Sequence, residues 1–320
     1  MPVINSSTYK PPFYLFNAHL QTIVPALFRQ VKNINYSRER IATNDNDFLD
    51  LDWVLNPSDK LAIISHGLEG DSNRPYVKGM AKILKKAGFE VLAWNFRGCS
   101  GEINKQLRFY HSGATEDLDH VINHALKKNT YNEIMVLGFS LGGNLTLKYL
   151  GEQGDKINSK IKRSVVYSVP LNLHSSCTKI SRPENHLYSR RFLKRLKKKI
   201  LDKSIMIPDQ LSMEGYSTIK NLKDFDNKYT APLHGFKDAV AYYEACSAIN
   251  FLNNISIPTL IVNAKNDPFL SKDCFPEEQL KAHPFVYLES PDKGGHCGFY
   301  AHNQNGHYWS ELRALQFFTE

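Results

Sequence analysis

One serine of the chain stands in a pattern that is typical of a nucleophile. The segment GFSLGGN (138–144) follows a short apolar run and precedes a stretch with helical spacing, 141–150. Glycines two residues before and two residues after a serine allow a tight turn from strand to helix, which projects the hydroxyl from the sheet edge at the helix N-terminus. The pattern predicts nucleophilic chemistry at Ser140, and the alternative is a turn serine without a chemical role.

A serine nucleophile needs a base to accept its proton and an acid to orient that base. In sites built on a strand–turn–helix elbow, the three residues follow each other along the chain as serine, acid and histidine. Asp267 comes shortly after one apolar run, and His296 lies in the glycine-rich segment GGHCG (294–298) after the next run. We therefore expect Ser140 to attack, His296 to accept and return the proton, and Asp267 to fix the imidazole tautomer.

Acyl transfer also needs N–H donors for the negative charge that develops on the carbonyl oxygen. The first candidate is the backbone N–H of Leu141, the residue after the nucleophile. The second should come from the segment HGLEG (66–70), which follows another apolar run, and there we choose the backbone N–H of Leu68. For His66 we expect a structural, hydrogen-bonded imidazole.

These residues require a scaffold in which short strands alternate with helices. The apolar runs predict strands at 61–65, 89–96, 133–138, 164–169, 259–264 and 285–288, and helical spacing predicts helices at 76–87, 115–128 and 141–150. Strands that are apolar throughout are buried on both faces, as in a parallel sheet between two layers of helices. The sequence thus predicts an α/β fold with a mostly parallel central sheet and helices on both faces, and it favours Thr115 as a helix N-cap.

The alternation of strands and helices lapses between residues 170 and 251. This segment has a helical, basic and tyrosine-rich pattern. An insertion of that length in the middle of a sheet is most simply a cap over the carboxyl edge of the strands, where α/β proteins bind their ligands. We therefore expect one domain, 1–320, with a helical cap insertion at 170–251.

Most of the net positive charge falls in one part of this cap. The formal net charge of the chain is +8, and the segment 186–203 holds eight Lys or Arg and one Asp, a net charge of +7. Its apolar residues recur at helical spacing: Phe192, Leu196 and Ile200, with Leu193 and Leu201 alongside. Two interpretations stay open, a helix that packs this stripe inward with a solvated basic face, or peripheral contact with an anionic membrane. No nucleic-acid-binding motif accompanies the charge, so we expect no nucleic acid partner.

The composition excludes several classes of protein. The chain has 320 residues, of which 42% are hydrophobic and 12% aromatic, enough for a sizeable core and outside the range of disordered chains. No run approaches the roughly 20 apolar residues of a membrane helix, and the polar N-terminal residues do not have a signal-peptide pattern. The five cysteines are scattered without a CxxC pair, which argues against a disulfide scaffold and a structural zinc. We expect a cytoplasmic protein.

Several motifs together resemble the α/β-hydrolase superfamily, and within it the YheT-like branch of esterases and lipases. In chain order they are YKPP (9–12), NAHLQT (17–22), HGLEG (66–70), NFRGCSG (95–101), YHSGATED (110–117), GFSLGGN (138–144), NDP (266–268) and GHCG (295–298). The resemblance implies a serine carboxylester hydrolase that acts on short-chain esters, acylglycerols or related lipids. It also implies that the enzyme uses no metal and no organic cofactor.

Two other functions are compatible with the same residues. An acyltransferase would use the same triad with an alcohol or lysolipid in place of water, and His111 with Asp117 could form an acyltransferase-like pair, although five residues separate them rather than the usual four. A binding protein with this fold would carry an idle triad. For Arg97 we derive no chemical role, and we expect it to pair with Asp117 or Glu116 and hold the loops around the nucleophile.

Overall fold

The strands of the computed structural model form a single mixed sheet. The structure describes residues 2–4, 6–128, 130–301 and 305–320, and within them the sheet has nine strands. They are β1 (Val3–Ile4), β2 (Ser37–Ala42), β3 (Phe48–Val54), β4 (Lys60–Ser65), β5 (Glu90–Asn95), β6 (Glu133–Phe139), β7 (Ile161–Tyr167), β8 (Thr259–Val262) and β9 (Val286–Glu289). Their spatial order is β1-β9-β8-β7-β6-β4-β5-β3-β2. Only β2–β3 and β3–β5 pair antiparallel, so the predicted mostly parallel sheet is confirmed.

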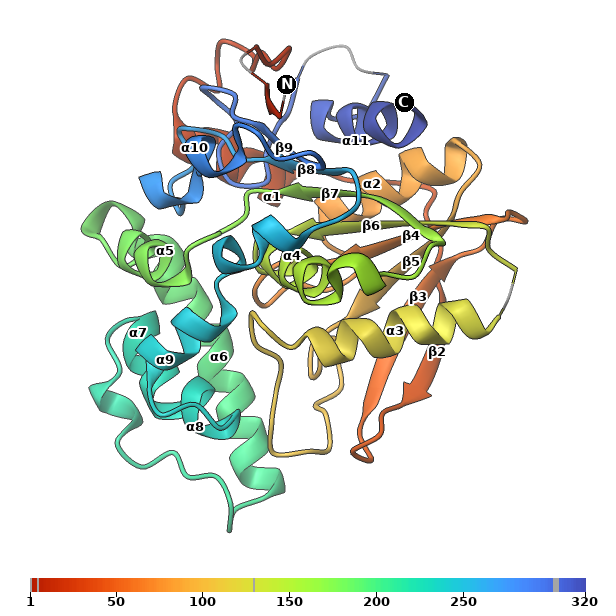
Figure 1. Cartoon of the computed structure of the whole chain (residues 1–320). Coiled ribbons are helices and arrows are strands. Elements are labelled where there is room, and N and C mark those ends of the chain that lie inside the picture. The colour runs from red at the N-terminus through yellow and green to blue at the C-terminus, as the bar shows by residue number, and fades with distance from the viewer. Residues whose placement is uncertain (1, 5, 129, 302–304) are drawn as a thin grey trace.

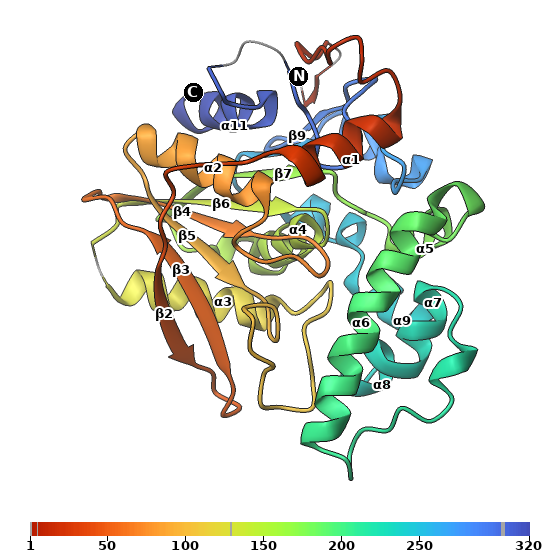
Figure 2. The same ribbon diagram turned by 180° about the vertical axis from the view of Figure 1, so that it is seen from behind.

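Helices cover both faces of the sheet, as predicted (Figure 1, Figure 2). The helices outside the segment between β7 and β8 are α1 (Ala18–Phe28), α2 (Pro75–Lys86), α3 (Thr115–Lys127), α4 (Leu141–Gln153), α10 (Glu277–Leu280) and α11 (Trp309–Thr319). Side chains of α3 and α4 pack on one face of the sheet, and those of α2 and α11 pack on the other. Along β4, Leu61 and Ile63 join the first core while Ala62 and Ile64 join the second, because successive strand residues point to opposite faces.

One helix start differs from the prediction. The N-cap of α3 is Ala114, and Thr115 is the first residue of the helix itself. The Thr115 hydroxyl instead donates a hydrogen bond to the Glu152 carboxylate on α4, with 2.6 Å between the oxygens. Tertiary packing against α4 therefore overrides the local preference of threonine for the cap.

A group of helices separates β7 from β8 and forms a cap beside the carboxyl edge of the strands (Figure 2). It contains α5 (Leu173–Ile180), α6 (His186–Met206), α7 (Leu222–Phe225), α8 (Ala231–Leu233) and α9 (Ala239–Cys246). The cap has its own apolar core, in which Leu196 and Ile200 of α6 pack with Leu222 and Phe225 of α7. We propose 170–251 as the bounds of this insertion within one domain, 1–320.

Helix α6 carries the basic segment, but not all of its basic residues lie on the solvated face as expected. Arg190, Arg191, Lys194, Lys197 and Lys198 are exposed, as the solvated-face interpretation requires. That interpretation is wrong for two other lysines: Lys203 is fully buried, and Lys199 is 8% exposed. Both lie inside because they have buried oxygen partners on the α/β core.

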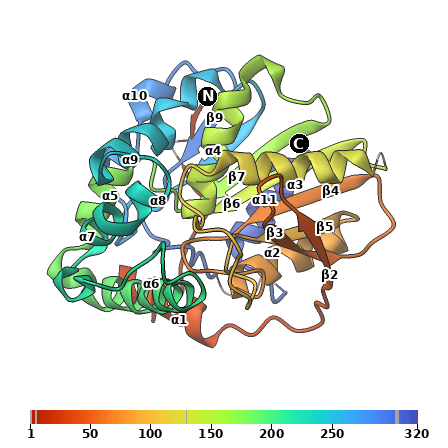
Figure 3. The same cartoon turned by 90° about the horizontal axis from the view of Figure 1, so that it is seen from below.

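The apolar stripe of α6 is narrower than predicted. Leu201 is 43% exposed rather than packed inward, and Leu187 and Ile205 are exposed as well. Tyr188 at the start of α6 stacks on His19 of α1, with 3.0 Å between the Tyr188 hydroxyl and His19 Nδ1, so α1 and α6 lie side by side (Figure 3). Within the described part of the chain, no helix is both long and apolar enough to cross a membrane.

Candidate active site

Ser140 occupies a sharp turn between β6 and α4. Its backbone has φ +54° and ψ −119°, a conformation that L-residues rarely adopt, and its N–H donates to the carbonyl of Tyr167 at 2.8 Å. A Cβ at Gly138 would collide with the backbone of Gly142, and a Cβ at Gly142 would collide with the backbone after β4. The two glycines therefore leave the space in which this turn can form, and the turn presents the Ser140 hydroxyl at the sheet edge.

The structure brings the three sequence-predicted residues into one hydrogen-bonded chain. Ser140 Oγ lies 3.0 Å from His296 Nε2, and His296 Nδ1 lies 2.8 Å from Asp267 Oδ2. Asp267 is 3% exposed, and its other oxygen accepts the backbone N–H of Phe269 at 2.9 Å. When Nδ1–H donates to Asp267, Nε2 is left to accept the serine proton, which is the arrangement of a serine–histidine–aspartate relay.

The charge of Asp267 sets the basicity of the imidazole. Burial alone disfavours the imidazolium of His296, but the carboxylate of Asp267 and its hydrogen bond outweigh burial and raise the pKa of His296. The ring of Phe269 packs against the imidazole of His296, with 4.2 Å between the ring centroids. The pair therefore makes His296 a stronger base than an isolated histidine.

Helix α1 holds the histidine loop in place, a role that sequence reasoning missed. The Thr22 hydroxyl accepts the backbone N–H of His296 at 2.9 Å, and the side-chain oxygen of Gln21 accepts the N–H of Gly294 at 2.8 Å. Asn266 donates to the same Gln21 oxygen and accepts the N–H of Gly295. Gln21 is 1% exposed and Thr22 is 7% exposed. Polar residues at the buried positions of this helix, within the NAHLQT motif, were the available signal.

The two predicted oxyanion donors are the backbone N–H groups of Leu68 and Leu141. The neighbours of Leu68 are engaged, since Gly67 N–H donates to the Tyr76 hydroxyl at 3.0 Å and Glu69 N–H donates to the Tyr110 hydroxyl at 2.8 Å. Among the described residues neither Leu68 N–H nor Leu141 N–H has a hydrogen-bond partner. Both leucines line the same cavity as Ser140. Two unused donors beside the nucleophile are what a developing oxyanion requires.

Helix α6 ties down the loop that carries Leu68. Glu69 has φ +51°, and its carboxylate lies 2.7 Å from the buried ammonium of Lys199. Its carbonyl oxygen accepts from the guanidinium groups of Arg195, at 2.8 Å, and Arg74, at 2.6 Å. Part of the basic charge of α6 thus serves to hold the loop between β4 and α2, which the sequence did not reveal.

His66 has the structural role that was expected. Its Nδ1 lies 2.8 Å from the Gly67 carbonyl, and its Nε2 accepts the N–H of Phe96 at 3.2 Å. Burial lowers the pKa of His66 to about 3, so the imidazole stays neutral. The ring orders the backbone next to Leu68 and has no free nitrogen for catalysis.

Arg97 pairs with Asp117, as predicted. The guanidinium makes two hydrogen bonds to this carboxylate, at 2.7 and 2.8 Å, and a third group, Nη1, reaches Asp45 and Asp47 at 2.9 Å each. Asp117 is therefore committed to Arg97, and no described contact joins it to His111, whose Nδ1 accepts the N–H of Gly113. The acyltransferase-like histidine–aspartate pair does not form.

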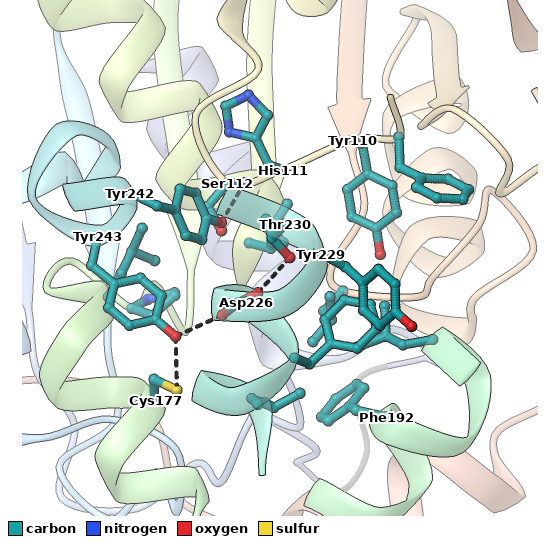
Figure 4. Close-up of a pocket in the computed structure, with 18 of the residues that line it drawn as sticks. Tyr110, His111, Ser112, Cys177, Phe192, Asp226, Tyr229, Thr230, Tyr242 and Tyr243 are labelled. Atoms are coloured by element: carbon teal, nitrogen blue, oxygen red, sulfur yellow. Dashed lines mark hydrogen bonds between the residues drawn. The ribbon is translucent and has the colours of Figure 1, made fainter. Parts of the chain in front are cut away.

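Two cavities meet at the nucleophile. The cap pocket lies between the α/β core and helices α5–α9 (Figure 4), and the second cavity, here the α1 pocket, lies between α1, the start of α2 and α6. Both are lined by Leu68, Ser140, Phe192, Phe269 and His296. An ester has one group on each side of its reacting carbonyl, and a nucleophile between two cavities can accommodate both groups.

Comparisons with known proteins agree with this geometry. Residues 62–302 match the family model described as alpha/beta hydrolase fold. The chain is 33% identical over 301 residues to a candidate esterase, YheT, of Escherichia coli strain K12, covering 92% of this chain and 88% of that protein. It is 28% identical to the mouse phospholipase ABHD3 over 93% of this chain and 74% of that protein.

Two further comparisons show less about this chain. The chain is 29% identical to a monoacylglycerol lipase of Saccharomyces cerevisiae, over 84% of this chain and 62% of that protein. Among solved structures, an esterase of Pyrococcus furiosus, Pf2001, superposes with a TM-score of 0.59 at 20% identity, covering 99% of this chain and 98% of that one. This last similarity shows the fold alone. From the elbow, the sheet order and these matches, the chain belongs to the α/β-hydrolase family and is an esterase- or lipase-type member with a YheT-like sequence.

Proposed function

We propose that the protein is a serine carboxylester hydrolase that cleaves short-chain esters, acylglycerols or related lipid esters through an acyl-enzyme intermediate. The observation that supports this most strongly is the Ser140–His296–Asp267 chain of hydrogen bonds at the junction of two largely apolar cavities. The names of the relatives, which include a phospholipase and a monoacylglycerol lipase, support an ester of a lipid class as substrate.

The first half of the reaction forms the acyl-enzyme. Ser140 Oγ adds to the ester carbonyl carbon while His296 Nε2 takes the hydroxyl proton, and the carbonyl electron pair moves to the oxygen that the N–H groups of Leu68 and Leu141 stabilise. The tetrahedral intermediate then collapses. The bond to the alcohol oxygen breaks, and the alcohol leaves with the proton that His296 returns.

The second half releases the acid. His296 accepts a proton from water, the water oxygen adds to the acyl carbon, and the same two N–H groups stabilise the second oxyanion. Collapse breaks the bond to Ser140 Oγ, which recovers its proton from His296. Asp267 keeps its negative charge throughout and stabilises the imidazolium in both halves.

Replacement of the nucleophile tests this proposal. Ser140→Ala should abolish hydrolysis of p-nitrophenyl esters and labelling by a fluorophosphonate, while the melting temperature stays close to that of the wild type. Ser217→Ala, at an exposed position of the cap, is the matched control and should keep both activities. Hydrolysis by Ser140→Ala at the wild-type rate would overturn the assignment. Wild-type protein that takes no label and cleaves no ester would favour the binding protein, and ester product formed from an added alcohol would favour the acyltransferase.

We also propose that α6 contacts anionic membranes, where lipid esters are found. Five exposed cations, Arg190, Arg191, Lys194, Lys197 and Lys198, lie on the helix next to the exposed apolar residues Leu187, Leu201 and Ile205. Each cation near an anionic surface contributes about 1 kcal/mol. Co-sedimentation with vesicles that contain anionic lipid should exceed that with neutral vesicles, and the excess should disappear when the five cations are replaced by Gln. Equal sedimentation with both vesicle types would remove this part of the proposal.

The state of the cysteines supports a reducing, cytoplasmic compartment. All five cysteines are free thiols. Burial raises the pKa of Cys99 to about 11 and that of Cys177 and Cys246 to about 12, which makes these thiols poor nucleophiles. They behave as small apolar residues of the core and cap.

A further inference from the structure

We propose that the cap pocket selects a substrate whose group in that pocket carries a cationic hydrogen-bond donor, an ammonium, and that Asp226 is the residue that recognises it. This inference rests on the proposed function in one respect, since it takes the bound group to be part of an ester that is cleaved at Ser140. Binding of the ammonium itself does not depend on catalysis and can be measured separately.

The position of Asp226 is unusual for a carboxylate. It begins a short π-helical turn, Asp226–Thr230, directly after α7, and its side chain lines the cap pocket (Figure 4). The surrounding wall is mostly apolar, with Leu173, Ile180, Phe192, Leu222, Phe225 and Leu233. A charged group in such a wall is expensive unless another group compensates its charge.

The hydrogen bonds of Asp226 leave part of the carboxylate unused. The Thr230 hydroxyl donates to Oδ1 at 2.6 Å, and the Tyr243 hydroxyl donates to Oδ2 at 2.6 Å (Figure 4). A carboxylate has roughly four acceptor positions, so about two remain. Both donors are neutral groups that orient the carboxylate and do not cancel its charge.

Within the described part of the chain, no side-chain cation compensates the charge of this carboxylate. Among the described residues none forms an ion pair with Asp226. The ammonium of Lys199 also lines the pocket, but it is 2.7 Å from the carboxylate of Glu69. Burial lowers the pKa of His111 and His234, two of the three histidines that line the pocket, so both stay neutral, and the third, His296, is paired with Asp267. Burial raises the pKa of Asp226 to about 6, which leaves it mostly ionised at pH 7.5.

Aromatic rings complete a site that suits a cation. Phe225 and Tyr229 have ring centroids 5.4 Å apart, and Tyr242 and Tyr243 have ring centroids 5.2 Å apart. All four line the cap pocket with Asp226. The faces of aromatic rings attract cations, and recognition of quaternary ammonium groups by several aromatic residues is an established use of this attraction. Neutral hydroxyl donors would also fit, although they would leave the charge uncompensated.

The geometry separates the Asp226 carboxylate from the ester that reacts at Ser140. Ser140 belongs to the turn between β6 and α4, whereas Asp226 belongs to the cap wall of the same cavity, and no described hydrogen bond or ion pair links Asp226 to Ser140, His296 or Asp267. Asp226 is therefore a residue that determines specificity and not a member of the relay. The ammonium must be carried on the acyl or alcohol chain at some distance from the carbonyl.

Binding of small probes to the unreactive Ser140→Ala protein tests the inference. Hexylammonium should bind more tightly than hexanoate, and Asp226→Asn, which keeps the shape and removes the charge, should raise the Kd of hexylammonium roughly tenfold or more. Asp202→Asn, at a partly exposed carboxylate on α6, is the matched control and should leave this Kd unchanged. Equal affinity of both probes, or an unchanged Kd in Asp226→Asn, would overturn the proposal. If Asp226→Asn does not fold, the comparison of the two probes on the Ser140→Ala protein, in which Asp226 is intact, still tests the proposal.

Turnover then connects the site to catalysis. The wild type should prefer p-nitrophenyl 6-aminohexanoate to p-nitrophenyl heptanoate in kcat/KM, and Asp226→Asn should lose that preference. If hexylammonium binds as described but no ester is cleaved, the proposed function fails and the ammonium site stands. If both esters are cleaved equally by the wild type, the site fails and the proposed function stands.

Discussion

Removing the ammonium of Lys199 should weaken both the cap and the loop that presents the Leu68 N–H. The side chains of Lys199 and Glu69 are 9% and 8% exposed, so Lys199→Met leaves a buried carboxylate without its counter-charge. Breaking such a pair costs about 3–5 kcal/mol. Glu69 keeps the hydrogen bond from the Tyr110 hydroxyl at 2.8 Å, so we expect the lower end, about 3 kcal/mol. For a chain of this size that is a fall in melting temperature of roughly 5 °C.

The same change should reduce the rate. Loss of one oxyanion donor lowers kcat about 10²–10³-fold. Arg74 and Arg195 still hold the carbonyl of Glu69, so the Leu68 N–H is displaced only in part, and we expect kcat to fall about tenfold. Lys199 also lines the cap pocket, and an effect on kcat that came from a change in that pocket would vary with the length of the acyl chain. A displaced oxyanion donor should lower kcat equally for short and long chains.

The assay compares three variants by thermal unfolding and by hydrolysis of a series of p-nitrophenyl esters. Lys198→Met is the matched control, because its ammonium is exposed and pairs with Asp202 on the surface, which is worth at most about 1 kcal/mol. Lys199→Met with Glu69→Gln should recover part of the lost stability, since no unpaired charge is left, while kcat stays low. An unchanged kcat in a destabilised Lys199→Met protein would refute the role of the ion pair in positioning the loop.

Two further predictions concern the histidine. His296 must be neutral to accept the serine proton, so kcat/KM of the wild type should fall as the pH drops through the pKa of His296. Asp267→Asn removes the charge that raises this pKa, so the acid limb of its pH–rate profile should lie at lower pH. Its kcat should also be reduced about 10⁴-fold. An acid limb at the wild-type position would contradict the electrostatic role of Asp267. Thr22→Val leaves the N–H of His296 without its acceptor and should lower kcat about tenfold, which steady-state kinetics would measure, whereas Thr22→Ser should restore it. Equal rates for the Val and Ser variants would show that this hydrogen bond does not position the loop.

The arrangement of Ser140, His296 and Asp267 was predictable because each of these residues has a strong local signal. The glycines around Ser140 are required by a turn that has no room for a Cβ, and this requirement is visible as a pattern of residue types. Asp267 and His296 follow strands that are apolar throughout, and the topology of a parallel sheet places the ends of such strands together. Sequence order and strand ends were therefore sufficient to propose which residues meet.

The first strands were missed because they do not have the apolar pattern of the others. All seven residues of β3 are buried, but two of them are Asp50 and Asp52. Each carboxylate is paired with an arginine of β2, Arg40 and Arg38, at 2.7 Å. The carboxylates are buried, whereas the arginines of β2 stay partly exposed. Along the chain β3 therefore shows acidic residues inside a buried strand, and their role becomes clear only when the partner strand is known.

The supports of the site were missed for the same reason, since they depend on partners far away in sequence. Thr22 and His296 are separated by 274 residues, and Lys199 and Glu69 by 130. The basic pattern of α6 indicated a solvated face. Helical spacing puts Lys199 and Lys203 on the same face as Leu196 and Ile200, but the sequence does not show the distant oxygen partners that allow these two lysines to lie inside. Local patterns predict the elements and the site on them, while the long-range polar contacts emerge only from the assembled fold.

The most direct test of the central claim is mass spectrometry of the enzyme quenched during turnover of p-nitrophenyl butyrate. We predict a butyryl group on the peptide that contains Ser140, formed with a burst of about one p-nitrophenol per chain and absent from Ser140→Ala. Asp267→Asn should form the same adduct more slowly. Rapid turnover with no adduct at Ser140, or with the acyl group on another residue, would contradict the account.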